Sequence, residues 1–309
     1  MISAIIMFFL LINEYLNYRQ NIMTTLTYVD KDRGTDQVLV NIDLDLYNFP
    51  CELLSIEIRN DLGLRVQNIE GNLTKYSINS KNEILGQKPY SLENLGRFGH
   101  DHDHIAQPDY ELVKNQLKNK EGCRLEGNFY IDAVPGSFII SGKAFYPTIE
   151  RLRREGLDTA NLEHKINHLF FGKSLSKRDL RFSVLRNNLF NTLNEKTRRN
   201  EKNQMVYQYY LKIVPVKYRH ENSKPLNKYQ YTYNSFSDFV YNGIPSIYFK
   251  YDLSPITIEY KFTHMKFLTF LINIFAVLGG VFTVAGILDA IIHKSVVALL
   301  RKAEMNKIS

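Results

Sequence analysis

The sequence predicts a mainly β domain of sandwich type, with short helical insertions, flanked by two helices that cross a membrane. Several segments in the middle of the chain alternate apolar and polar residues, which is the period of two expected for half-buried strands. The longest apolar runs stand near the two ends of the chain, where membrane helices would bracket the middle segment. With 309 residues, 44% of them hydrophobic, the chain is large and apolar enough to build a core.

The first apolar run, Met1 to Ile12, is shorter than a comfortable membrane span. It could be the core of a signal peptide. However, no basic residue precedes it, no small-residue cleavage site follows it, and the polar residues Asn13 and Glu14 come directly after it. We therefore expect a truncated first transmembrane helix over residues 1–18 of a chain that is longer in nature.

Two strands are expected next. The segment from Val38 to Leu46 places apolar residues at every second position, with Asn41, Asp43 and Asp45 between them. This alternation predicts one face in a core and one face in water. The segment from Leu54 to Ile58 repeats the pattern after a turn-forming break. We therefore expect two strands of an antiparallel sheet.

Later segments extend the β pattern. Leu125–Ala133 and Phe138–Ala144 flank Pro135-Gly136, a dipeptide typical of tight turns, and this predicts a hairpin. Further alternating strands are expected at Met205–Ile213, Ile247–Leu253 and Ile256–Tyr260. These elements predict one β-rich domain over residues 19–266.

Helical spacing within this domain is confined to two short segments, Asp109–Lys120 and Asn161–Phe170. The second of them carries His164 and His168, which are four residues apart and would share one helix face. Three interpretations stay open for this pair: a metal site, a structural pair beside neighbouring phenylalanines, or a pH sensor. A catalytic zinc helix would have a glutamate after the first histidine, and this chain has Lys165 there.

Residues 267–292 form the second predicted membrane helix, with only Asn273 and Asp289 strongly polar among 26 residues. At the α-helical rise these residues reach roughly 39 Å, which is enough to cross a hydrocarbon core of about 30 Å. Residues 293–309 would then form a tail on the opposite side of the membrane from the β domain.

One surface of this second membrane helix consists of small residues. Such surfaces let two helix backbones approach closely in lipid, so we expect this one to pack on the first helix or on a partner subunit. Its members are Ala276, Gly279, Gly280, Thr283 and Gly286.

The side of the membrane on which the β domain lies is indicated by a modification motif rather than by charge. Lysines flank the second membrane helix on both sides, so the positive-inside rule is nearly balanced. Asn72-Leu73-Thr74 is a glycosylation sequon, with Asn72 as acceptor, and it favours a lumenal domain. The net charge of +7 is spread along the chain without any nucleic-acid motif, so no nucleic-acid partner is expected.

The chain has two cysteines, Cys51 and Cys123, both in the β-rich domain. In an oxidising lumen they could form a disulfide, and in a reducing compartment they would be small buried apolar residues. Sequence alone leaves both interpretations open.

A histidine run forms the most conspicuous candidate metal site. His100, His102 and His104 alternate with aspartates, so in an extended chain three imidazoles would line one face as zinc or copper ligands. The alternative is a hydrated loop between glycines. The chain contains no nucleophile elbow, phosphate loop or dinucleotide fingerprint, so we expect neither an active site nor a cofactor.

The chain resembles the endoplasmic-reticulum vesicle protein family, also called the ER–Golgi intermediate compartment (ERGIC) proteins. The resemblance covers nearly the whole chain and is carried by motifs in the same order. They are Tyr28-Val29-Asp30-Lys31 with Arg33-Gly34, Asn41-Ile42-Asp43, Pro50-Cys51, Glu121-Gly122-Cys123, Val134-Pro135-Gly136-Ser137-Phe138, His164, His168, Phe171-Gly172, Tyr210-Leu211-Lys212-Ile213-Val214-Pro215, Tyr251-Asp252-Leu253-Ser254-Pro255, and Gly279 to Gly286 with Asp289.

This resemblance implies two membrane spans, cytosolic termini and a lumenal β-sandwich-like domain. It also implies a non-enzymatic cargo receptor subunit, located in endoplasmic reticulum, intermediate-compartment and Golgi membranes and carried in COPII vesicles. Its partners would be a related two-span subunit, lumenal cargo proteins, and vesicle coats that bind the tail. The chain looks closest to the larger receptor subunit, although that subunit's cysteine cluster is absent and Asn306 replaces one lysine of a dilysine signal.

Two other functions are compatible with the sequence. An accessory subunit of a lipid-flipping pump would have the same plan of two spans and a large lumenal domain, but such subunits normally carry two disulfides. A metal-dependent lumenal enzyme built on the histidines would need a bound metal beside a pocket.

Overall fold

The computed structural model describes residues 2–29, 37–64, 70–90, 107–157, 162–173, 192–199, 204–220, 224–240 and 243–308. The chain divides into two compact units. A helical unit comprises Met1–Thr25, Arg219–Lys224 and Tyr260–Ser309, and a β unit comprises Leu26–Tyr218 and Pro225–Glu259.

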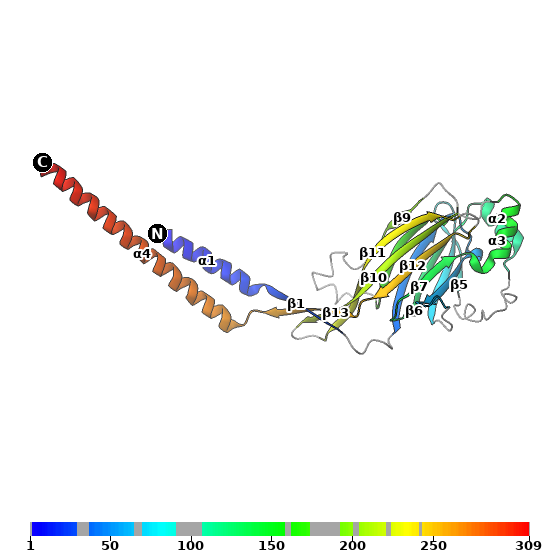
Figure 1. The fold of residues 1–309 in the computed structure, drawn as a ribbon, viewed down its shortest axis with the longest axis horizontal. Coiled ribbons are helices and arrows are strands. Elements are labelled where there is room, and N and C mark those ends of the chain that lie inside the picture. Colours follow the sequence, from blue (N-terminus) through cyan, green and yellow to red (C-terminus); the bar gives the residue numbers. More distant parts are fainter. Residues whose placement is uncertain are drawn as a thin grey trace. The chain divides into compact units, whose positions relative to one another are not determined.

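Thirteen strands, four α-helices and two short 3-10 turns make up the described part of the chain (Figure 1). In chain order they are α1 (Ile2–Arg19), β1 (Asn21–Val29), β2 (Gln37–Leu46), η2 (Cys51–Leu53), β3 (Ser55–Asn60), β4 (Gly71–Ile78), β5 (Ile84–Tyr90), α2 (Tyr110–Lys118), β6 (Gly122–Asp132), β7 (Gly136–Ser141), η5 (Lys143–Phe145), α3 (Tyr146–Arg154), β8 (His164–Phe171), β9 (Lys196–Arg198), β10 (Met205–His220), β11 (Leu226–Phe239), β12 (Ser246–Leu253), β13 (Ile256–His264) and α4 (Phe267–Ile308).

The strands form two sheets, and the prediction of a mainly β fold is confirmed. A seven-stranded sheet has the order β1-β13-β10-β12-β7-β3, with β11 paired to β10, and a six-stranded sheet has the order β5-β4-β6-β2-β8-β9. Strand β2 lies near the centre of the six-stranded sheet and runs antiparallel to both β6 and β8. In the other sheet β10 pairs with β12 in parallel, so that connection crosses over instead of turning back directly.

One hydrophobic core lies between the two sheets and takes side chains from both. The ring of Phe249 on β12 stacks between Tyr209 and Phe138, with centroid distances of 5.1 and 4.6 Å. Phe129 of the six-stranded sheet meets Phe138 edge-on at 5.4 Å. Aromatic pairs of this kind bury apolar area and also prefer particular ring arrangements. They therefore hold the two sheets in a defined arrangement.

The predicted hairpin around Pro135-Gly136 is wrong, although both of its strands exist. Strand β6 lies between β4 and β2, whereas β7 lies between β12 and β3 in the opposite sheet. Because the two strands belong to different sheets, the turn between them carries the chain from one sheet to the other. The inward faces of β6 and β7 therefore meet across the core instead of along a shared edge.

The predicted helix at Asn161–Phe170 is also wrong, because this segment contains strand β8. The pairing of β8 with β2 shifts register between Asp43 and Leu44, which inserts one extra residue on β8. Buried Leu162, Ile166 and Leu169 consequently fall at helical spacing, even though the backbone is extended. The other predicted helix is confirmed as α2, whose first turn is capped by the side chain of Asp109.

The outer face of β2 departs from the expectation that it lies in water. Asp43 and Asp45 are only 3% and 7% exposed, because side chains from β6 and β8 cover them. A buried carboxylate needs hydrogen-bond or charged partners, and this face of the sheet supplies both.

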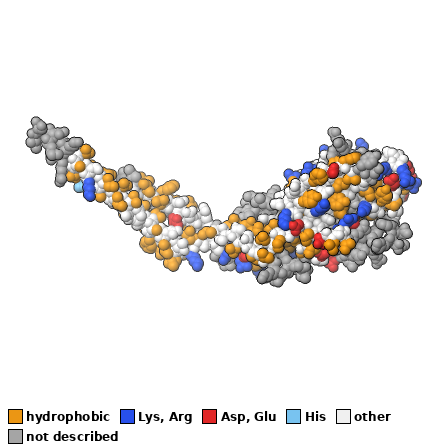
Figure 2. Space-filling model, viewed as in Figure 1, with side chains coloured by type: hydrophobic (Ala, Val, Ile, Leu, Met, Phe, Trp, Pro, Cys, Tyr) orange, Lys and Arg blue, Asp and Glu red, His pale blue; other side chains and the backbone are white. Residues whose placement is uncertain are grey.

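In the helical unit, α1 packs against α4. Tyr18 stacks on Phe270 with a centroid distance of 4.4 Å, and the amide of Asn273 donates a 2.7 Å hydrogen bond to Glu14. Within α4, Phe267–Leu299 is the one stretch among the described residues that is long and apolar enough to span a membrane. Hydrophobic side chains are numerous along the visible face of this unit (Figure 2).

Candidate functional site

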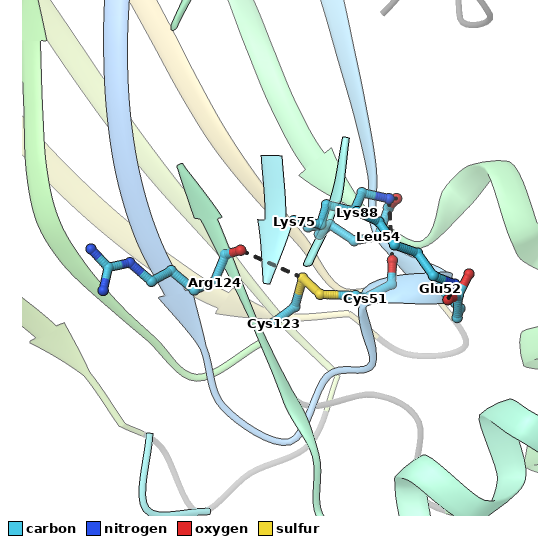
Figure 3. The surroundings of a disulfide bond; sticks show 7 residues. All are labelled: Cys51, Glu52, Leu54, Lys75, Lys88, Cys123 and Arg124. Carbon is cyan, nitrogen blue, oxygen red and sulfur yellow. Dashed lines mark hydrogen bonds and ion pairs between the residues drawn. A yellow bond between two sulfur atoms is a disulfide. The ribbon is translucent and has the colours of Figure 1, made fainter. Parts of the chain in front are cut away.

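The β unit contains a polar corner organised around one disulfide (Figure 3). Cys51 on η2 is joined to Cys123 at the start of β6, with 72 residues of separation and a Cα–Cα distance of 4.8 Å. Both residues are buried, at 4% and 0% exposure. The bond therefore fastens the turn between β2 and β3 to the six-stranded sheet.

Lys75 on β4 reaches into this corner although it is only 9% exposed. Its ammonium donates hydrogen bonds to the carbonyl oxygens of Cys51, at 3.1 Å, and Leu54, at 2.5 Å. It also lies over the ring of Tyr90, 3.9 Å from the centroid. Burial lowers the pKa of Lys75 to about 7, because removing a cation from water disfavours the charged form.

Three further residues frame the same corner. Tyr90 is held in place by the backbone N–H of Ile56, which donates to its hydroxyl at 3.1 Å, and burial raises the pKa of Tyr90 to about 12. At the solvent side, Lys88 forms an ion pair with Glu52. In Figure 3 both lysines lie on the same side of the disulfide as Glu52, and Arg124 extends from the other side.

A second polar cluster covers the outer face of β2. Arg124 on β6 donates to both carboxylate oxygens of Asp43, at 2.8 and 2.6 Å, and this bidentate contact raises the pKa of the guanidinium. Asn167 on β8 donates to Asp43 at 3.2 Å and to Asp45 at 2.9 Å. Burial raises the pKa of Asp45, and the bond from Asn167 opposes that rise. The cluster is an internally satisfied network that joins three strands.

The two histidines of β8 lie on opposite faces of the sheet, so the prediction that they share one face is wrong. His164 is fully buried, with Nδ1 2.8 Å from the Leu162 carbonyl and Nε2 2.7 Å from the Tyr209 hydroxyl. Burial lowers the pKa of His164 to about 4, so the ring is neutral at the pH of the early secretory pathway. His168 faces outward, with Nδ1 3.6 Å from Asp43. The bulge in β8 separates the pair.

The other predicted site residues have different outcomes. His100, His102 and His104 lie outside the described residues, so their metal binding stays a prediction. Within the described ranges no group of three histidine, cysteine or acidic side chains could hold a metal ion. Asn72 is exposed on β4, where its side chain is accessible for modification.

The small-residue surface of α4 does not face α1. Contacts with α1 are made by Phe270 and Asn273, whereas no atom lies within 4 Å of a Cβ built on Gly279, Gly280 or Gly286. Of the two expected partners for this surface, α1 is therefore excluded in the structure. A subunit outside this chain remains as the predicted partner.

Lys75 and the Glu14–Asn273 contact were missed at the sequence level. Nothing in the strand pattern around Lys75 distinguishes it from a solvated lysine, because its partners lie on η2 and β5. Glu14 and Asn273 are polar residues in or beside apolar runs of the sequence. Because isolated polar residues in such helices usually pair with one another, their positions could have predicted this contact.

A disulfide-bonded domain of two packed β-sheets, followed by a helix able to span a membrane, defines a membrane-anchored protein of an oxidising compartment. The family model for the endoplasmic reticulum vesicle transporters matches residues 90–289, and that for the Endoplasmic Reticulum-Golgi Intermediate Compartment (ERGIC) proteins matches residues 1–67. The chain belongs to the endoplasmic reticulum vesicle transporter family, and it functions in vesicle transport between endoplasmic reticulum and Golgi.

Several relatives align over most of the chain, and two of them illustrate the likeness. Endoplasmic reticulum-Golgi intermediate compartment protein 1 of Xenopus laevis is 29% identical over 291 residues, which are 92% of this chain and 82% of the relative. The probable compartment protein 3 of Dictyostelium discoideum is 25% identical over 336 residues, covering 91% and 85%. The predicted family is thus confirmed, while the assignment to the larger-subunit branch stays a prediction.

Among solved structures, the crystal structure of Erv41p aligns with a TM-score of 0.49 and 20% sequence identity. The alignment covers 76% of this chain and 99% of that one.

Proposed function

We propose that this chain is a non-enzymatic subunit of a membrane cargo receptor, which sorts or retrieves lumenal proteins between endoplasmic reticulum and Golgi. The observation that carries the proposal is the combination of family membership with one large β unit joined to a helix of membrane-spanning length. Such a plan suits a protein that presents a binding surface on one side of a membrane and is transported as part of that membrane.

The proposed topology has two spans, with the domain of residues 19–266 in the lumen and residues 293–309 in the cytosol. The disulfide between Cys51 and Cys123 supports a lumenal domain, because such bonds persist in oxidising compartments. The exposed sequon at Asn72 supports the same side. The packing of α1 on α4 supports a first span, since Glu14 and Asn273 satisfy each other's polar groups within an apolar helix pair.

The proposed receptor contains a second, related subunit. The small-residue surface of α4 supports this, because α1 packs elsewhere and leaves that surface open to another helix. Lumenal cargo would bind the β unit, and vesicle coat proteins would bind the tail.

Chemical crosslinking in native microsomes tests this proposal. After solubilisation, tagged full-length protein is purified and the crosslinked proteins are identified by mass spectrometry. We expect a related family subunit and lumenal soluble proteins, and we expect the related subunit to be lost from the Gly280→Leu variant. The Phe275→Leu variant, which changes an exposed apolar position of α4, is the matched control. Recovery of neither class of protein from vesicles that contain the wild type would contradict the proposal.

A further inference from the structure

The corner around Lys75 contains a buried amine that lacks a carboxylate partner among the described residues. Among the described residues no carboxylate lies within ion-pair distance of the Lys75 ammonium, whose contacts are two backbone carbonyls and one aromatic ring. The nearby carboxylate of Glu52 is paired with Lys88 instead. Burying a charge without a counter-charge is costly, and a bound anion would remove much of that cost.

The amine of Lys75 borders a pocket with room for a ligand. The pocket has a volume of about 190 Å³ and is lined by Cys51, Glu52, Lys75, Ser77, Lys88, Pro89 and Tyr90. A water molecule occupies about 30 Å³ in the liquid, so the space is several times larger than one water requires. The lining combines a polar group at Ser77 with the apolar surfaces of Pro89 and Tyr90.

We propose that this pocket binds a small organic carboxylate, with its charge on Lys75 and its carbon skeleton against Tyr90 and Pro89. The single uncompensated ammonium matches a monoanion. A dianion such as phosphate would bring more negative charge than Lys75 neutralises, next to the carboxylate of Glu52. The ligand is therefore either a free organic acid or the C-terminal carboxylate of a polypeptide.

The pocket is also rigid enough to act as a preformed site. Lys75 is fixed by the carbonyls of Cys51 and Leu54, and Cys51 is itself tied to β6 by the disulfide. The hydroxyl of Tyr90 accepts from the backbone of Ile56. A site whose groups are already held in place loses little entropy when a ligand binds.

Calorimetric titration of the full-length protein in detergent micelles tests the proposal, with benzoate as the probe in chloride-free buffer. We expect saturable binding that weakens by roughly tenfold or more in Lys75→Met, because the charge-assisted contact is lost. Lys81→Met is the control, since Lys81 is exposed in the turn between β4 and β5. Phosphate should bind more weakly than benzoate. Absence of saturable binding, or equal affinity in Lys75→Met, would overturn the proposal.

A second measurement uses the wild-type protein and does not depend on a variant that must fold. Reductive methylation is followed at each lysine by mass spectrometry, with and without benzoate. Slower modification of Lys75, with unchanged modification of Lys81, is expected; equal rates at Lys75 would count against the site. Competition by a short peptide with a free C-terminus, but not by its amidated form, identifies a polypeptide end as the ligand, and competition by free acids alone identifies a small organic acid.

Discussion

His164 shows how one buried side chain couples the stability of the β unit to pH. In the folded protein both ring nitrogens are occupied, by Leu162 and Tyr209, and burial lowers the pKa of His164 to about 4. In the unfolded chain the pKa of a histidine is about 6.5. Below that pH the unfolded state gains a proton that the folded state does not take, so the free energy of unfolding falls as pH falls.

The first prediction follows from this difference. Between about pH 6.5 and pH 4 the wild type loses about 3 kcal/mol of unfolding free energy through His164. The loss is measured as a decrease in melting temperature, followed by the near-ultraviolet circular dichroism of the tyrosines. His164→Gln should show a shallower pH dependence, while His168→Gln, at a half-buried position on the outer face of the same strand, should show a dependence much closer to that of the wild type. Identical pH dependence in His164→Gln and wild type would contradict this account.

The second prediction concerns Arg124, whose guanidinium satisfies the buried carboxylate of Asp43. Arg124→Met removes the bidentate partner of that carboxylate, which is 4% exposed and keeps only its contacts with Asn167 and His168. Because Arg124 is itself one-third exposed, water relieves part of the penalty, and we expect a cost of about 2 kcal/mol. Glu126→Gln removes only the distant, exposed partner of the same arginine and should cost less than about 0.5 kcal/mol. Thermal melts of both variants measure the difference. Equal melting temperatures would contradict the role of Arg124 as the main partner of Asp43.

At this scale the sequence shows which positions of a strand are polar, but it does not show which side chains surround each of them. Asp43 and Asp45 occupy the polar positions of an alternating strand, and the alternation cannot show that Arg124 and Asn167 will cover them. Lys75 is likewise indistinguishable from a surface lysine until β5 and η2 are placed beside β4. The environments depend on which strands become neighbours, and that is not encoded locally.

At the scale of elements, the disulfide is the strongest single restraint on η2. The third prediction is that Cys51→Ala combined with Cys123→Ala lowers the unfolding free energy by about 4 kcal/mol, in the chain-entropy estimate for a loop of 72 residues. The melting temperature of the double variant, compared with that of wild type under non-reducing conditions, measures the loss. Since Lys75 bonds to the carbonyl of Cys51, the same variant should also expose Lys75 to amine-reactive reagents. An unchanged melting temperature would show that the bond does not form.

The fourth prediction concerns the pairing of α1 with α4. Cysteines introduced as Tyr18→Cys and Phe270→Cys should crosslink readily, because the two rings are stacked in the structure. Adding Asn273→Leu removes the hydrogen bond to Glu14, which is worth about 1 kcal/mol in a membrane, and should slow crosslinking several-fold. Asn13→Leu, at the exposed neighbouring position, is the control. Equal crosslinking rates in Asn273→Leu and Asn13→Leu would mean that the polar contact does not hold the helices.

The elements differ in how well their sequences predict them. The strict alternation of Val38–Leu46 predicts β2 with correct bounds at its C-terminal end, and the apolar run from Phe267 predicts the start of α4. In contrast, the bulge in β8 gives buried residues a helix-like spacing, and Pro135-Gly136 looks the same whether it closes a hairpin or passes between sheets. Both errors arise because strand pairing is decided by distant partners.

At the scale of the whole molecule, the chain divides into two units with different roles. The β unit has its own core and disulfide, and the helical unit contains the apolar helix pair. Family resemblance in the sequence predicts this organisation because the motifs extend from Tyr28 into α4, and the family models match residues 1–67 and 90–289. The anion pocket has no such sequence signature, since its residues come from β4, β5 and η2.

The fifth prediction tests the central claim, that the β unit lies in the lumen while the end of the chain lies in the cytosol. Sealed microsomes that contain the full-length protein, with a tag after Ser309, are treated with protease and then analysed with antibodies to the tag and to the β unit. We expect the tag to disappear and a fragment containing the disulfide-bonded β unit to survive until detergent opens the membrane. Digestion of the β unit in sealed microsomes, with survival of the tag, would contradict the claim.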